Sequence, residues 1–164
     1  LLAMLLTLSM VLSMAVGAVT VSAETEETRV IVDSMDRSVE IPADVQRIVC
    51  VGVGALRYTC YVGGADRVVG VEDYETKPGM SRLYNYVNFD RFQDLPVTGT
   101  NGEPFVEEIV NVEPQVIVMS AYAKQDPDEL SQKTGTPVVV VPGSDTTLRR
   151  AVPRRGGAAV LPAA

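Results

Sequence analysis

The sequence predicts an α/β domain in which helices flank a parallel sheet, preceded by a short N-terminal β-hairpin. Two observations favour this fold class. Short apolar runs of the buried-strand type recur along the chain, and helix-length segments separate them. Strands that alternate with helices form parallel sheets joined by right-handed crossovers.

The N-terminal hairpin is expected from two short β segments around a polar turn. They are Arg29–Val32 and Ser38–Ile41, and Pro42 ends the second because proline cannot donate a ladder hydrogen bond. Arg47–Val51 follows as a continuous apolar run, which is typical of a strand that is buried on both faces.

A glycine-flanked turn, Gly52-Val53-Gly54, leads from this strand into the first expected helix. That helix covers Ala55–Val62, and Gly63-Gly64 ends it. Arg67–Val71 is then the second buried strand.

Residues Glu72–Gln93 form a long connection rich in Tyr, Asn, Pro and Gly, with one helical turn expected near Ser81–Tyr86. The remaining segments alternate again between strand and helix. We expect strands at Leu95–Thr98, Gln115–Met119 and Pro137–Val141. Helices are expected between them, at Pro104–Asn111 and Pro127–Lys133.

Composition limits the possible functions. The chain has 164 residues, 46% of them hydrophobic, which is enough for one domain with a real core. Its formal net charge is −7, although the last 16 residues hold four Arg and no acid. The rest of the chain is therefore strongly acidic, and a negative charge repels nucleic acid and anionic lipid surfaces. We expect no nucleic-acid partner.

Histidine is absent, which excludes a histidine-built metal site and Ser–His or Cys–His nucleophile pairs within this chain. We therefore expect no catalytic residues and no metal ligands. The two cysteines, Cys50 and Cys60, leave two alternatives. They could form a disulfide, which export would permit, or serve as buried thiols.

The two ends of the chain differ from its body. Leu1–Val21 is apolar and uncharged, and Val21-Ser22-Ala23 has small residues at the spacing of a signal-peptidase site. We expect residues 1–23 to be a cleaved signal peptide, with an uncleaved membrane anchor as the alternative. Residues 149–164 are expected to be a disordered or frameshifted tail, which leaves 24–148 as the domain.

One segment suggests an enzyme. The residues from Gly52 to Arg57 partly match the dinucleotide fingerprint G-x-G-x-x-G, between a strand and a helix. Glu72, about 20 residues further on, stands where a ribose-binding acid would lie. However, Arg57 replaces the third glycine. A nucleotide-binding oxidoreductase domain is therefore kept as an alternative, and a plain strand-to-helix turn is the simpler interpretation.

The same turn belongs to a candidate binding edge. In open α/β sheets, ligands bind beyond the carboxyl ends of the strands. Arg57 could pair with a carboxylate or with the oxygens of a chelate, and Tyr74 and Tyr122 could pack on a flat ligand. The expected ligand-binding residues are Val53, Gly54, Arg57, Glu72, Tyr74, Asn101 and Tyr122.

Four segments carry a resemblance to a known family, and they occur in that family's order: DSMDRSVEIPADVQRIVCVG, ALRYTCYVGGADRVVGVEDYE, GEPFVEEIVNVEPQVIVMSA and LSQKTGTPVVVV. From about Arg29 to Thr147, the chain resembles the N-terminal lobe of the iron-complex and vitamin B12 (Fe/B12) family of periplasmic solute-binding proteins of ABC importers. Gln115 stands where that family often has Asp.

The resemblance implies two α/β lobes joined by a long helix, with the ligand held between them. The second lobe would begin near the tail, so the chain is expected to be truncated. The implied function is extracytoplasmic binding of an iron chelate of the siderophore class, with a membrane ABC permease as partner. It implies no resident cofactor and no enzymatic reaction. Cobalamin or haem are the alternative ligands, and a fragment without stable affinity is a further alternative.

Overall fold

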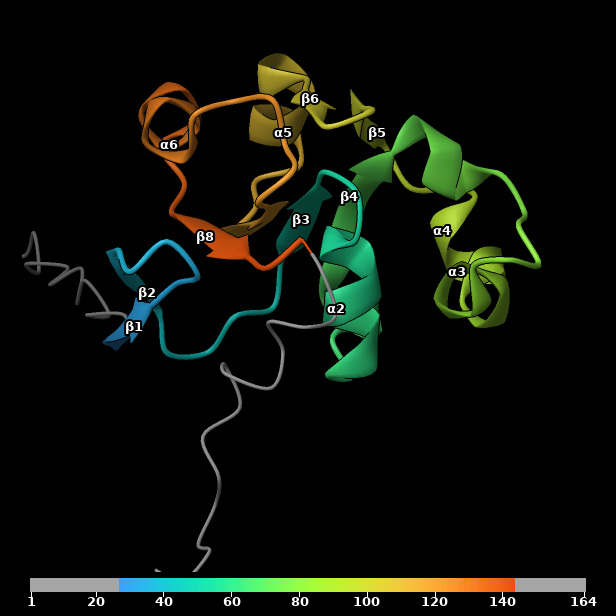
Figure 1. Cartoon of the computed structure of the whole chain (residues 1–164), viewed down its shortest axis with the longest axis horizontal. Coiled ribbons are helices and arrows are strands. Elements are labelled where there is room, and N and C mark those ends of the chain that lie inside the picture. The colour runs from blue at the N-terminus through green and yellow to red at the C-terminus, as the bar shows by residue number, and fades with distance from the viewer. Residues whose placement is uncertain (1–26, 144–164) are drawn as a thin grey trace, which may run out of the picture.

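The structure is a computed structural model, and it describes residues 27–143. The expected signal peptide and the expected tail lie outside these residues. The described part contains a two-stranded antiparallel sheet and a six-stranded sheet with the order β6-β5-β4-β3-β7-β8 (Figure 1). The strands are β1 (Thr28–Val32), β2 (Ser38–Pro42), β3 (Ile48–Val51), β4 (Val68–Glu72), β5 (Val97–Thr100), β6 (Glu103–Pro104), β7 (Val116–Ser120) and β8 (Val138–Val141).

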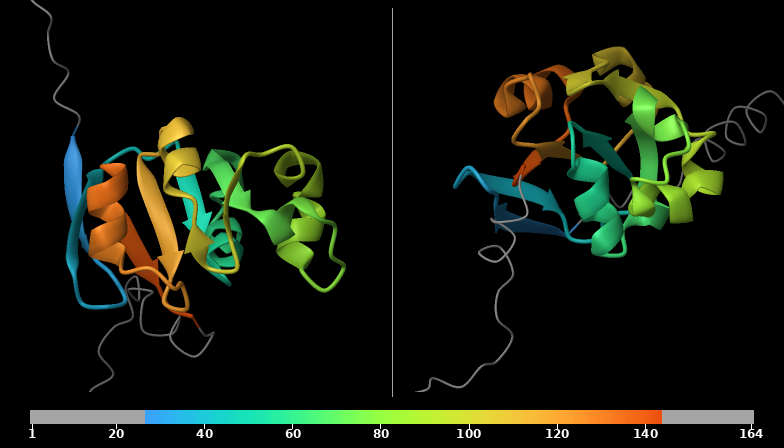
Figure 2. Two further views of the ribbon diagram at one scale, coloured as in Figure 1. Left: turned by 90° about the horizontal axis from the view of Figure 1, so that it is seen from above. Right: turned by 45° about the vertical axis from the view of Figure 1, so that its right-hand side comes forward.

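Helices cover both faces of the large sheet. They are α2 (Ala55–Tyr61), α3 (Leu83–Val87), α4 (Phe89–Phe92), α5 (Val106–Asn111) and α6 (Pro127–Thr134), with the 3₁₀ turns η2 (Ala65–Arg67) and η3 (Asp73–Thr76). Figure 2 shows α5 and α6 on one face and α2 on the other. Among residues 27–143, no helix combines the length and the apolar character that crossing a bilayer requires.

Strand order places a topological switch at the centre of the sheet. The chain passes from β3 outward to β4 and β5, and then returns to the other side of β3 as β7 and β8. These five strands are parallel, and β6 pairs antiparallel with β5 at the edge. The carboxyl ends of the five parallel strands therefore meet at one edge, with β3 and β7 adjacent there.

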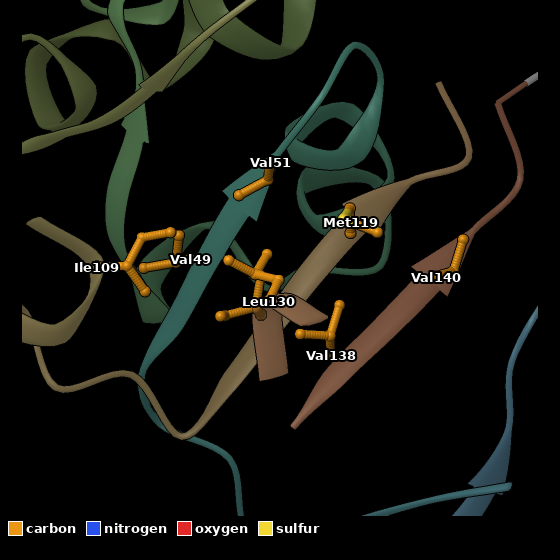
Figure 3. Close-up of a cluster of buried hydrophobic side chains, with 8 residues drawn as sticks. Val49, Val51, Ile109, Met119, Leu130, Val138 and Val140 are labelled. Carbon is orange, nitrogen blue, oxygen red and sulfur yellow. The ribbon is translucent and has the colours of Figure 1, made fainter. Parts of the chain in front are cut away.

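The core explains why the central strands read as continuous apolar runs. Alternate residues of β3 and β8, such as Val49 and Val140, point to the face covered by α5 and α6, where Ile109 and Leu130 pack on them (Figure 3). On the opposite face, Cys50 packs with residues of α2 and α4. Because both faces are covered, apolar residues are needed at every position of these strands.

The hairpin is attached to the exposed edge of β8. The backbone N–H of Ser34 donates to the carbonyl of Val140 at 3.0 Å, and the Val140 N–H donates to the Asp33 carboxylate at 3.3 Å. Arg37 donates to the same carboxylate and to the carbonyl of Val138. The turn between β1 and β2 therefore covers a strand edge that would otherwise be free to pair with another chain.

The predicted fold class is confirmed: the sheet is mostly parallel, helices flank it, and a hairpin precedes it. The expected strands agree with β3, β4, β7 and β8 to within a residue or two at each end. The position of Pro104 was predicted wrongly. It lies in β6, where its missing N–H is tolerated at a sheet edge, and α5 begins only at Val106.

The cysteines are free thiols, so the disulfide alternative is wrong. Burial raises the pKa of Cys50 to about 12 and that of Cys60 to about 11. Both thiols are therefore protonated and unreactive at neutral pH.

Candidate functional site

The candidate site is the carboxyl edge of the parallel strands around the switch between β3 and β7. Three loops meet there. A Cβ atom added at Gly52 would lie 3.1 Å from the Cβ of Ser120, and one added at Gly102 would lie 3.3 Å from the Cα of Ala123. The N–H of Lys124 also donates to the carbonyl of Gly102 at 3.0 Å. The loops after β3, β5 and β7 are thus in direct contact.

Glu72 ends β4 between these loops, and its side chain turns into the protein. The residue is only 2% exposed. Its Oε1 accepts hydrogen bonds from the backbone N–H groups of Gly52 and Gly102, both at 2.8 Å. A ribose-binding acid would have to present its oxygens outward, so this geometry removes the main support for the nucleotide-binding alternative.

Three of the predicted residues are exposed on the loops of this edge. They are Val53 after β3, Asn101 between β5 and β6, and Tyr122 after β7. Asn101 has φ +49°, a conformation that asparagine tolerates better than most residues. The ring of Tyr122 lies against Gly143, where any Cβ would overlap it. The side chains that can touch a solute here therefore come from separate loops.

Gly54 and Arg57 lie at the start of α2. Gly54 is the N-cap residue with φ +95°, a left-handed conformation that favours glycine. Arg57 is half-buried, and its guanidinium carbon lies 5.2 Å from the centre of the Tyr58 ring. This cation–π contact holds the guanidinium group close to the edge.

Tyr74 lies in η3, directly after β4, and is part of a polar cluster that was not predicted from the sequence. The Arg82 guanidinium stacks over its ring at 5.1 Å. Arg82 also donates to the Glu75 carboxylate at 3.2 Å, and Tyr84 donates to it at 2.8 Å. Asn85 adds a bond to the same carboxylate at 3.0 Å.

Burial determines the ionisation of this cluster. Glu75 is 1% exposed, and desolvation raises the pKa of its carboxyl group despite the bonds from Tyr84 and Arg82. Desolvation and the nearby acids also raise the pKa of Tyr74, so its hydroxyl stays protonated. The concentration of Tyr, Asn and Arg in the long connection after β4 was the available sequence signal. Only the fold reveals that Glu75 is their common partner.

The arrangement fits binding better than catalysis. It combines aromatic rings, the guanidinium groups of Arg57 and Arg82, and exposed loop residues at the carboxyl ends of the strands. Within residues 27–143 no three His, Cys, Asp or Glu side chains gather in a way that could hold a metal ion. The edge can offer positive charge and flat apolar surface to a solute. The carboxylates of Glu72 and Glu75 already accept hydrogen bonds from the protein.

Solved structures resemble the described residues, whereas no protein-family model and no curated protein matches the chain. The molybdate-binding protein MolA of Haemophilus influenzae has a TM-score of 0.58 at 23% identity, over 70% of this chain and 34% of MolA. The catecholate-siderophore-binding protein VctP of Vibrio cholerae has a TM-score of 0.54 at 29% identity, over 70% of this chain and 37% of VctP.

A third match is SirA of Staphylococcus aureus, solved with staphyloferrin B, with a TM-score of 0.53 at 26% identity over 70% of this chain and 36% of SirA. MolA and VctP are both periplasmic binding proteins. The chain thus spans about a third of the length of the proteins that it matches. The described residues form one lobe of the fold of periplasmic solute-binding proteins that serve ABC importers.

Proposed function

We propose that this chain is the substrate-binding component of an ABC importer, acting outside the cytoplasm, and that its ligand is an iron chelate of the siderophore class. The observation that supports this ligand is the match to VctP, at 29% identity and a TM-score of 0.54. SirA, at 26% identity, supports it further. MolA shares only 23% identity and supports the fold alone.

The chemistry of the edge supports the same ligand class. An iron chelate presents oxygen atoms, often with a net negative charge, and flat organic groups. Arg57 offers a guanidinium to such oxygens, while Tyr74 and Tyr122 offer aromatic faces. Val53 and Asn101 are exposed on their loops and complete the proposed contact surface, whereas Gly54 is buried at the start of α2. Glu72 was expected among these contacts, but its side chain is buried and so lies outside this surface.

A single lobe leaves much of a ligand in water, whereas pockets usually bury more than about 70% of a ligand of this size. The residues 24–148 are proposed to form one such lobe, and the matching part of the chain covers only 34% of MolA and 37% of VctP. We therefore expect this chain to bind a ferric siderophore less tightly than VctP does in the same assay.

The test is a titration followed by intrinsic tyrosine fluorescence, because the chain has six Tyr and no Trp. The probes are a ferric catecholate siderophore, ferric staphyloferrin B, haem, cobalamin and molybdate. Quenching by a ferric siderophore at lower concentrations than by any other probe supports the proposal. Tighter binding of haem, cobalamin or molybdate would contradict the ligand class, and binding of none would contradict solute binding by this chain.

A further inference from the structure

The buried carboxylate of Glu72 joins two loops that are distant in sequence. Gly52 lies 20 residues before Glu72, and Gly102 lies 30 residues after it. Both glycines have positive φ angles, +84° and +78°, so their backbones adopt a conformation that other residues take up with strain. Both N–H groups donate to the same carboxylate oxygen.

Burying this carboxylate has a cost that the two hydrogen bonds must offset. Within residues 27–143, no hydrogen-bond partner reaches its second oxygen, Oε2. A buried acid with an unpaired oxygen is unfavourable unless its other bonds compensate. An apolar residue at the end of β4 would avoid the cost, as Val51 does at the end of β3.

The loops that Glu72 joins are the loops that carry the proposed contacts. Gly52 precedes Val53 and Gly54, and Gly102 follows Asn101. The loop with Tyr122 is attached to the same unit, because Lys124 donates to the carbonyl of Gly102. Three loops from both sides of the topological switch are therefore connected around one side chain.

We propose that Glu72 is a positioning residue of the binding edge: it holds the loops after β3 and β5 at a defined separation and does not itself contact the ligand. The link between the loops stands on the geometry alone, while its effect on binding rests on the proposed function.

Two substitutions separate the carboxylate's acceptor role from its charge and volume. Glu72→Gln keeps an oxygen that can accept both N–H groups. Glu72→Met has a similar volume and no oxygen. Glu75→Gln is the matched control, because Glu75 is equally buried and its carboxylate accepts hydrogen bonds from Arg82, Tyr84 and Asn85 instead.

The first measurement needs no ligand. Hydrogen exchange of the Gly52 and Gly102 amides, followed by NMR on the full chain, should accelerate about tenfold or more in Glu72→Met, because each N–H loses its acceptor. Glu72→Gln and Glu75→Gln should retain slow exchange at both amides. Unchanged exchange in a folded Glu72→Met variant would overturn the proposal.

A pH titration tests the same link if the Met variant fails to fold. The Gly52 and Gly102 amide signals of the wild type should shift as Glu72 titrates, and Glu72→Gln should abolish that shift. The groups that interact with Glu72 are Asp73, Glu75, Tyr74 and Cys50. Glu75 lies nearby and could also cause such a shift. If the pH-dependent shift of the amide signals disappears in Glu75→Gln and persists in Glu72→Gln, it does not arise from Glu72 and the proposal is overturned.

The second measurement uses ferric catecholate siderophore as the probe. Glu72→Met should weaken binding about tenfold, since misplaced contacts lose much of their energy, and Glu72→Gln should bind as the wild type does. Equal affinity in the Met variant, with altered amide exchange, would overturn the effect on binding. If no variant binds the probe, the proposed function fails, whereas the exchange result still decides the link between the loops.

Discussion

At the scale of single residues, Arg57 is the basic side chain that we propose to contact the ligand. It lies in the first turn of α2, next to the glycine turn that follows β3. Its stacking on Tyr58 orders the guanidinium before a ligand arrives. Less side-chain entropy is then lost when an anion binds, which is the usual advantage of a preorganised arginine.

We expect Arg57→Ala to weaken ferric siderophore binding by roughly 1.5–3 kcal/mol, because a charged hydrogen bond is lost. The fluorescence titration above measures the change. Arg67→Ala is the matched control, because Arg67 directly precedes β4 and so lies at the amino ends of the parallel strands, away from the candidate site. Unchanged affinity in a folded Arg57→Ala variant would remove Arg57 from the site.

Residue identity alone placed several of the candidate side chains at the edge, because strand ends can be located from apolar runs. It did not reveal the burial of Glu72 or the role of Glu75. Both depend on partners that approach in space, such as Gly102 for Glu72 and Tyr84 for Glu75. Acidic residues at a strand end look alike in sequence, whether they face water or the interior.

At the scale of elements, β4 and β5 are packed so closely that glycine is required at position 70. A Cβ added there would overlap the Cγ2 atom of Thr98, which is fully buried on β5. This contact explains why a glycine, usually unfavourable in a strand, lies in the middle of β4.

We expect Gly70→Ala to destabilise the protein by about 1–3 kcal/mol, as overpacking of a core does. Adding Thr98→Ser should recover part of this loss, because serine lacks the clashing methyl group and keeps a hydroxyl to bond the Val71 carbonyl. Urea denaturation of both variants measures the effect. Equal stability of the single and double variants would contradict this explanation.

The hairpin depends on one carboxylate. Asp33 accepts bonds from Arg37, from two amides of its own turn and from Val140 of β8. Burial opposes its charge, but the bonds from Arg37 and these amides outweigh burial and lower its pKa. The turn and the sheet edge are therefore held by the ionised form.

We expect Asp33→Ala to cost about 3–5 kcal/mol, because it leaves the half-buried Arg37 without its main partner. Ser34→Ala in the same turn is the control, since Ser34 bonds to β8 through its backbone and should cost little. Thermal unfolding followed by circular dichroism compares the two. A similar melting temperature for both variants would show that Asp33 does not anchor the hairpin.

At the scale of the whole molecule, the buried acids give stability an unusual dependence on pH. Burial raises the pKa of Glu72 and Glu75 above their ordinary value of 4.5. In the unfolded chain they lose their protons near that value, whereas in the folded chain they keep them to a higher pH. The folded state then binds more protons over this window, so stability falls as the pH rises through it.

Asp33 acts in the opposite direction and at lower pH. Its pKa lies below the ordinary 3.8, so its contribution is present above that value and is lost as the pH falls further. We therefore expect the free energy of unfolding to be highest in the mildly acidic range and to decline towards neutral pH. Urea denaturation at a series of pH values measures this profile.

Glu75→Gln should make the decline towards neutral pH shallower, because the amide cannot ionise. Glu107→Gln, on the exposed surface of α5, should leave the profile as it is in the wild type. A steeper decline in Glu75→Gln, or equal profiles for wild type and Glu75→Gln, would contradict this account.

The sequence by itself determined the alternation of strands and helices, the hairpin and the parallel sheet. These follow from local properties: apolar runs such as Val138–Val141, glycine turns such as Gly52–Gly54, and the conformations that proline and glycine permit. Only the tertiary structure decided which strands are neighbours, and therefore that the loops after β3 and β7 meet. It also decided which polar groups pair, since Asp33 finds Val140 across 107 residues of chain and Glu72 joins Gly52 to Gly102. Such pairings have no local signature, because their free energy comes from burying groups that the chain brings together only when it folds.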